Sequence, residues 1–185
     1  RFTTMDPMAE KYYSTSPYVY CANNPVNAID PDGRDYKIFI DQENNRIIIS
    51  ATYYASSQDI TFAQQAVDYW NNQSGKFTYQ TEGGGNYTVD FSLSAVEIQT
   101  DDSMSIGEVR GALNAALAED KSGVGNVFQI VKNSALEENT NGTTIGGNFI
   151  QVKDAQKTAD TGAHEVGHTS VSYTHLRAHE TLSDL

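Results

Sequence analysis

His164-Glu165-Val166-Gly167-His168 is the stretch that decides how this chain folds around its chemistry. Two histidines four residues apart lie on the same face of a helix, one turn above the other, so both imidazoles can bind one metal ion. Glu165 faces nearly the same place and can accept a proton from a water bound to that ion. The stretch therefore predicts a helix that carries a metal site. The alternative is a surface helix on which two histidines fall together.

Zinc (Zn²⁺) is the metal that this pattern favours, and hydrolysis of a peptide bond is the reaction. A catalytic zinc site takes three protein ligands and a water, whose pKa the ion lowers while it polarises the substrate carbonyl. We predict His164 and His168 as metal ligands and Glu165 as the catalytic base, which passes the proton to the leaving amine. Gly167 is expected to leave room beside the ion. Thr158, Asp160 or Thr161 could donate or accept a hydrogen bond that orients an imidazole, but helix capping or solvent contact is the expected role of each.

Composition limits the kind of protein this can be. The chain has 185 residues, 38% of them hydrophobic, which suits one ordinary domain with an appendage. Its net charge of −12, with the acidic residues spread out as on a solvated surface, argues against nucleic acid as the main partner. Cys21 is the only cysteine, so no internal disulfide and no cysteine-based metal cage can form. No run of 18 apolar residues exists, and we expect no membrane span.

Hydrophobic periodicity predicts an α+β fold with a mixed β-sheet. Strands are expected at 36–40, 46–50, 77–80, 87–91 with an extension to 98, 127–131 and 148–152. Two packing helices are expected at 59–73, with Asp59 or Thr61 as N-cap, and at 106–117. The helix bearing the metal motif follows, beginning near 154–158.

Residues 1–34 differ from the rest, because they contain all four prolines of the chain. The segment resembles the C-terminal end of the core in Rhs/YD-repeat proteins. The matching residues are Arg1-Phe2, Asp6-Pro7-Met8-Ala9-Glu10, Ser16-Pro17-Tyr18-Val19-Tyr20, Asn23-Asn24-Pro25 and Asp30-Pro31-Asp32-Gly33-Arg34. The resemblance implies an upstream β-shell and, from about residue 35, a variable toxin domain. The resemblance also suggests the hypothesis that the chain cleaves itself near Asp30. The alternative is that this stretch is a plain turn.

The predicted order of strands and helices in residues 35–169 is similar to the N-terminal subdomain of zincin peptidases, particularly the metzincin type. In that family the strand before the metal helix is the sheet edge that pairs with extended substrate. Residues 148–152 would hold that position here, which makes Phe149, Ile150 and Gln151 the expected substrate-binding residues. The alternative is an ordinary edge or hairpin strand without such a role.

Residues 170–185 depart from the metzincin pattern. That pattern places a glycine and a third histidine where this chain has Val171 and Thr174, and His175 lies one residue too far along. The stretch 172–181 resembles translated sequencing adapter, so we expect a non-native tail and a truncated peptidase domain. His175 is kept as a candidate third ligand. His175 and His179 are also four apart, and we interpret that spacing as accidental.

The sequence thus predicts the zinc-dependent peptidase domain of a polymorphic Rhs-type toxin, incomplete in this fragment. Its partners would be a protein or peptide substrate, a cognate immunity protein and the upstream β-shell. The chain begins at Arg1, and we expect a longer protein that is secreted or held at the cell surface and delivered into a target cell. The alternative is a non-catalytic binding or tip module of an Rhs protein that keeps a zincin-like fold.

Overall fold

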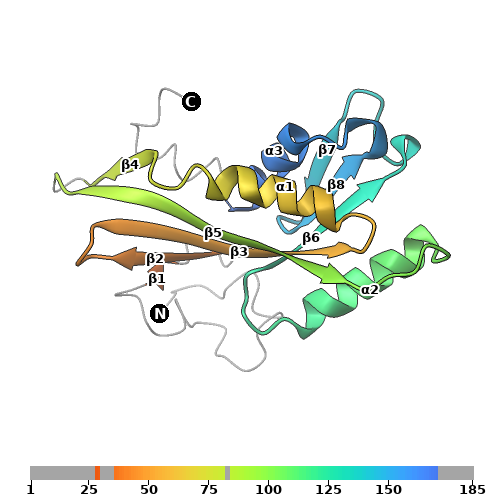
Figure 1. Ribbon diagram of the computed structural model, residues 1–185, viewed down its shortest axis with the longest axis horizontal. Helices are drawn as coiled ribbons and strands as arrows, with labels where there is room; N and C mark the ends of the chain where they lie inside the picture. Colours follow the sequence, from red (N-terminus) through yellow and green to blue (C-terminus); the bar gives the residue numbers. More distant parts are fainter. Residues whose placement is uncertain (1–27, 30–35, 82–83, 171–185) are drawn as a thin grey trace.

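The computed structural model describes residues 28–29, 36–81 and 84–170 (Figure 1). In chain order the strands and helices are β1 Ala28–Ile29, β2 Lys37–Asp41, β3 Arg46–Ser56, α1 Ile60–Asn71, β4 Phe77–Gln80, β5 Asn86–Ile98, α2 Ile106–Glu119, β6 Gly125–Val131, β7 Gly142–Ile145, β8 Phe149–Lys153 and α3 Ala159–Ser170. Short 3-10 turns, Asn133–Ala135 and Asp154–Gln156, follow β6 and β8. The α+β class with a mixed sheet is confirmed, and so is the order of the predicted strands and helices.

Strand β3 is the centre of an eight-stranded mixed sheet. Along its whole length it pairs in parallel with β5, which in turn pairs antiparallel with β4. On its other side, the first half of β3 pairs antiparallel with β2, and Thr52 to Ala55 pair in parallel with β6. The sheet then continues from β6 to β8 and from β8 to β7. A strand of 11 residues is long enough to serve both halves, which makes the sheet continuous.

The helices lie on both faces of this sheet (Figure 1). Helices α1 and α3 cover the face to which Ile49, Ala51, Tyr53 and Ala55 of β3 point. Helix α2 covers the opposite face, where its Leu113 packs with residues of β6 and β8. Because successive residues of a strand point to opposite faces, the alternation along β3 directs one row of side chains to each layer.

The start of α2 is fixed by a capping box. The Ser105 side chain accepts a hydrogen bond from the Glu108 backbone N–H, and the Glu108 carboxylate accepts one from the Ser105 N–H. Hydrogen bonds from the Ser105 side chain and backbone lower the pKa of Glu108. The carboxylate also lies in the first turn of the helix, where the helix dipole favours negative charge.

Helix α3 packs against α1 at a distance that only glycine permits. A Cβ atom on Gly167 would lie 2.9 Å from Cζ2 of Trp70, and one on Gly162 would lie 3.0 Å from the Cβ of Ala66. The Trp70 indole N–H donates a hydrogen bond of 2.7 Å to the carbonyl oxygen of Ala163. The prediction that Gly167 leaves room beside a metal ion is therefore corrected, because this glycine makes room for a tryptophan of α1.

The prediction that residues 148–152 form an edge strand is wrong. Strand β8 pairs on one side with β6 and on the other with β7, a short strand that the sequence analysis missed. A three-residue connection joins β7 to β8, and Gly146 and Gly147 in it have positive φ angles of 63° and 87°. Two adjacent glycines between β-compatible residues are a hairpin signal, so β7 could have been found from the sequence.

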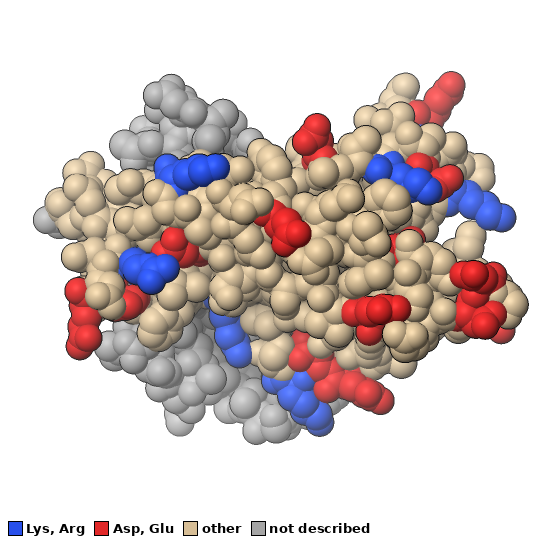
Figure 2. All heavy atoms as spheres, in the orientation of Figure 1, with Lys and Arg blue, Asp and Glu red and all other residues tan. Residues whose placement is uncertain are grey.

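Charged side chains are distributed over the surface. On the face shown in Figure 2, acidic and basic residues are interspersed. Arg46 and Asp90 form an ion pair of 2.6 Å between the neighbouring strands β3 and β5. Among the described residues, no helix is long and apolar enough to cross a membrane.

The α1–α3 contact can be tested with a pair of glycine substitutions. Gly167→Ala should lower the free energy of unfolding by about 1–3 kcal/mol, because the added methyl group meets the Trp70 ring. Gly111→Ala in α2 is the matched control, since nothing lies within 4 Å of a Cβ there. That variant should be stabilised by roughly 0.5–1 kcal/mol through higher helix propensity. Urea unfolding in the presence of EDTA measures both, and equal stabilisation of the two variants would contradict the close contact.

Candidate metal centre

Helix α3 begins where its sequence provides a cap. The Thr158 side chain accepts a hydrogen bond from the Thr161 N–H, and the Thr158 carbonyl accepts one from the Gly162 N–H. This satisfies donors at the helix start that have no partner within the helix. The capping role that the sequence predicts for Thr158 is confirmed. The helix begins at Ala159, directly after the predicted start region 154–158.

The two histidines of the motif lie side by side on α3. Their Nε2 atoms are 3.0 Å apart, and both side chains are exposed. Zinc–nitrogen bonds of about 2.0–2.1 Å at a tetrahedral angle separate two nitrogens by about 3.3 Å. His164 and His168 therefore need only a small rotation of their rings to chelate one ion. The same separation also allows a hydrogen bond between the rings when one of them donates.

Glu165 lies between the helix and strand β7 and is only 5% exposed. Its Oε2 accepts a hydrogen bond of 2.9 Å from the Thr144 hydroxyl. Its Cγ and Oε1 face Gly142, where a Cβ atom would come within 2.8 Å and 2.9 Å of them. One carboxylate oxygen and the ligand nitrogens of both histidines all lie within 4.8 Å of one another. The carboxylate is therefore held beside the point at which the two imidazoles meet.

A buried hydroxyl pair holds the last turn of α3 against the sheet. The Tyr53 hydroxyl, from the middle of β3, lies 2.6 Å from the Thr169 hydroxyl. Thr169 in turn donates a hydrogen bond of 2.9 Å to the carbonyl oxygen of Val166. Both side chains are buried, and Thr169 directly follows His168, so this contact fixes the rotation of the helix at the second histidine.

The residues that support the motif were not predicted from the sequence. Thr144 and Gly142 belong to β7, Trp70 to α1 and Tyr53 to β3, and each is far from the motif along the chain. No spacing rule links them to the motif, because their contacts arise from the packing of separate elements. The double glycine after β7 is the one sequence signal that could have pointed to two of them.

Apart from Glu165, the predicted base, the part of the chain that the structure describes offers no third metal ligand beside His164 and His168. Among those residues, His164, Glu165 and His168 are the one group of three side chains placed to hold a metal ion. Three predicted features lie outside the described residues. These are the candidate ligand His175, the tail from residue 171 onward, and the junction near Asp30. Of the predicted segment 1–34, only β1 is described, and it pairs antiparallel with β2.

Phe149, Ile150 and Gln151 do not have the geometry that their predicted role requires. Their backbone is paired on both sides, so they cannot receive a substrate strand by main-chain hydrogen bonds. All of them are buried, Ile150 in the core below α1 and α3 and Phe149 in the core below α2. Among the described residues, β7 pairs with β8 alone, and it is the edge on the side of Glu165.

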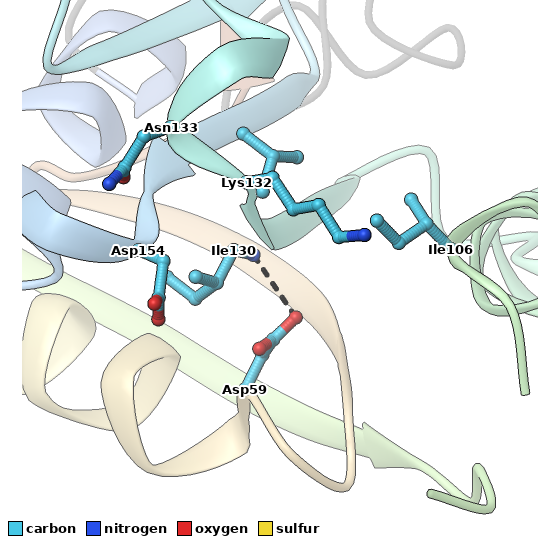
Figure 3. A pocket seen from close by; sticks show the side chains of 7 residues that line it. Asp59, Ile106, Ile130, Lys132, Asn133 and Asp154 are labelled. Carbon is cyan, nitrogen blue, oxygen red and sulfur yellow. Dashed lines mark hydrogen bonds between the residues drawn. The ribbon is translucent and has the colours of Figure 1, made fainter. Parts of the chain in front are cut away.

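A hollow of about 400 Å³ lies at the ends of β6 and β8, away from the metal motif (Figure 3). Asp59, which precedes α1, points into it and accepts a hydrogen bond of 3.1 Å from the Ile130 N–H. The Asp59 side chain thus joins α1 to β6 and makes no capping bond to its own helix, although Asp59 is the N-cap residue. Burial raises the pKa of this carboxyl, against the hydrogen bonds from Ile130 and Ser56 that lower it.

No protein-family model, no curated protein and no solved structure matches this chain.

Removal of the Asp59 charge should stabilise the fold at neutral pH. A carboxyl whose pKa is raised on folding stabilises the folded state fully when the pH lies below its ordinary pKa of 3.8. That stabilisation is lost as the pH rises through the higher pKa of the folded state. Asp59→Asn keeps an oxygen for the Ile130 N–H and removes the desolvated charge. Its free energy of unfolding should exceed that of the wild type at pH 7, and the excess should shrink as the pH falls through the raised pKa of the folded state and be gone below 3.8.

Asp68→Asn is the control for this experiment, because Asp68 is an exposed carboxylate on α1 that is hydrogen-bonded to the Gln64 side chain. Denaturant unfolding at several pH values measures all three proteins. An excess for Asp59→Asn that does not change with pH, or one that Asp68→Asn shares, would show that burial of the Asp59 charge is not its cause.

Proposed function

We propose that residues 36–170 belong to a zinc-dependent peptidase domain with a zincin-like fold. The observation that carries this proposal is the position of the Glu165 carboxylate beside two imidazole nitrogens that lie 3.0 Å apart. A hydrolytic zinc site needs this combination of two neutral nitrogen ligands and a nearby base. The mixed sheet of an α+β fold is compatible with the proposal, whereas the strand before the metal helix is interior here and departs from the edge strand that the resemblance implied.

The chemistry follows from the side chains. Zinc, when bound, would lower the pKa of a water and polarise the carbonyl group of the scissile bond. His164 and His168 offer their Nε2 atoms as ligands, and a third ligand has to come from outside the described residues, with His175 as the candidate in this chain. Glu165 accepts the proton of the attacking water and delivers it to the leaving amine.

Because β8 is an interior strand, the proposed substrate position cannot lie along it. We assign it to β7 in place of β8, because β7 combines an unoccupied pairing side among the described residues with contact to Glu165. A peptide strand added to β7 would lie about 4.8 Å farther out, in the same layer of the sheet. Its backbone would then pass beside the base and the histidine pair.

The wider context rests on the resemblance of residues 1–34, nearly all of them outside the described part of the chain. On that basis the domain is proposed as the toxin of a secreted or surface-held Rhs-type protein that is delivered into a target cell. An immunity protein would then protect the producing cell by covering the edge at β7 and the metal helix.

A non-catalytic binding module remains the second candidate. The observation in its favour is that the described residues supply two histidines and one glutamate but no further ligand. Such a module would use the edge of β7 to bind a partner and would hold zinc weakly or not at all. Zinc content and Glu165 substitution separate the two candidates.

Zinc content is the first measurement. The purified wild type should contain about one zinc ion per chain by atomic emission, and His164→Ala should contain almost none, because a single imidazole binds the ion weakly. His175→Ala examines the candidate third ligand in the same assay, and retention of zinc there would assign the ligand elsewhere. Absence of zinc from the wild type as well would contradict the peptidase proposal for this chain.

Glu165→Gln tests the reaction. The amide keeps the shape of the side chain but cannot accept a proton, so cleavage of fluorescein-labelled casein should fall by about 10²–10⁴-fold while zinc content is unchanged. Unchanged cleavage, or unchanged toxicity in a producing cell, would rule out Glu165 as the base. Circular dichroism of the variant verifies that the fold is retained.

A further inference from the structure

We propose that Thr144 is a positioning residue that holds Glu165 in the role of base and keeps its carboxylate from becoming a metal ligand. This inference rests on the proposed function, since it concerns the same metal centre. It assigns a role to β7 beyond that of a substrate edge, because the open edge of the strand would present its backbone to substrate while one of its side chains positions the base.

The geometry places both oxygens of Glu165 against β7. Oε2 receives the hydrogen bond of 2.9 Å from the Thr144 hydroxyl, which also lies 3.4 Å from the Glu165 carbonyl oxygen. Oε1 and Cγ lie against the backbone at Gly142, where any larger residue would overlap them. The carboxylate is thus bound on one side and sterically confined on the other.

A carboxylate in this position has two possible roles. It can bind zinc directly, with a zinc–oxygen distance of about 2.0–2.2 Å, or it can act through a water, at a distance on the order of 4 Å. A flexible glutamate next to a divalent cation with a small ligand set is drawn toward the metal by electrostatic attraction. A directly bound carboxylate takes the coordination position that water needs and loses its ability to accept the proton. A donor on the far side of the carboxylate opposes that movement.

Strand β7 is held firmly enough to do this. The segment that leads into it crosses from β6, and the buried ammonium group of Lys153 on β8 donates hydrogen bonds to the carbonyl oxygens of Glu137 and Glu138 in that segment. The Lys153 backbone N–H donates a bond of 2.9 Å to the carbonyl oxygen of Asn141, the residue before β7. Both ends of β7 are therefore fixed, one by Lys153 and the other by the hairpin to β8.

The test compares three substitutions in the full chain by zinc affinity, by the visible spectrum of the Co²⁺-substituted protein and by casein cleavage. In Thr144→Val the carboxylate loses its donor and binds the metal. Its zinc dissociation constant should therefore fall below that of the wild type, the Co²⁺ spectrum should change, and kcat should fall by about 10–100-fold with little change in KM. Thr144→Ser keeps the hydroxyl and should restore all three values.

Thr143→Val is the matched control for the metal measurements. Thr143 is the next residue of the same strand and points to the opposite face, so the same substitution there should leave the zinc dissociation constant and the Co²⁺ spectrum unchanged. If Thr144→Val does not fold, Gly142→Ala replaces it. The added methyl group displaces Glu165 from β7, and the same tighter zinc binding with lower kcat is expected.

The outcomes that overturn the inference differ from those that overturn the proposed function. Weaker zinc binding in Thr144→Val, or zinc binding equal to that of Thr143→Val, would show that Thr144 only supports the fold. A wild type that binds zinc but cleaves no casein would contradict the peptidase proposal, while the zinc affinities and Co²⁺ spectra would still decide the role of Thr144. A wild type that binds neither zinc nor Co²⁺ would overturn both.

Discussion

The close contact between α3 and α1 is the constraint on which the rest of the candidate site depends. Gly162 and Gly167 allow α3 to lie directly against Ala66 and Trp70, and the indole N–H is bonded to the α3 backbone. A helix has one rotation that buries a glycine-lined face in this way. That rotation turns His164 and His168 outward as a pair and Glu165 toward the neighbouring strand. The metal geometry is therefore a consequence of how two helices pack on one face of the sheet.

The second constraint is the mixed topology around β8. A sheet made only of parallel strands would end at β8 and leave its backbone free, whereas the short antiparallel β7 covers that edge. Because β7 and not β8 forms this edge of the sheet, a different set of residues can contact a substrate. Phe149, Ile150 and Gln151 become core residues, and the strand next to Glu165 is one whose side chains are small enough to let the carboxylate lie against the backbone.

Much of the fold could be predicted, because local sequence patterns indicate the type of most strands and helices. Strand β5, helix α2 and the apolar run of β6 have the expected type and nearly the expected bounds, whereas the central strand β3 continues six residues beyond its expected end at Ser50. The errors share a physical cause. β7 is short and glycine-bounded, so it carries little hydrophobic signal, and the edge position of a strand depends on the spatial order of strands rather than on their order in the chain. Gly167 was misassigned because glycine in a helix marks a close approach without showing to what.

The sequence by itself determined that His164 and His168 meet, because a helix brings residues four apart together wherever it lies in the protein. It also determined the alternation of core and surface residues along the strands, which follows from the pleat. Only the tertiary structure decided what surrounds Glu165. The contacts with Thr144 and Gly142 join segments more than 20 residues apart through a crossover and a hairpin. Such contacts depend on the summed packing of the sheet and both helices, which no local spacing encodes.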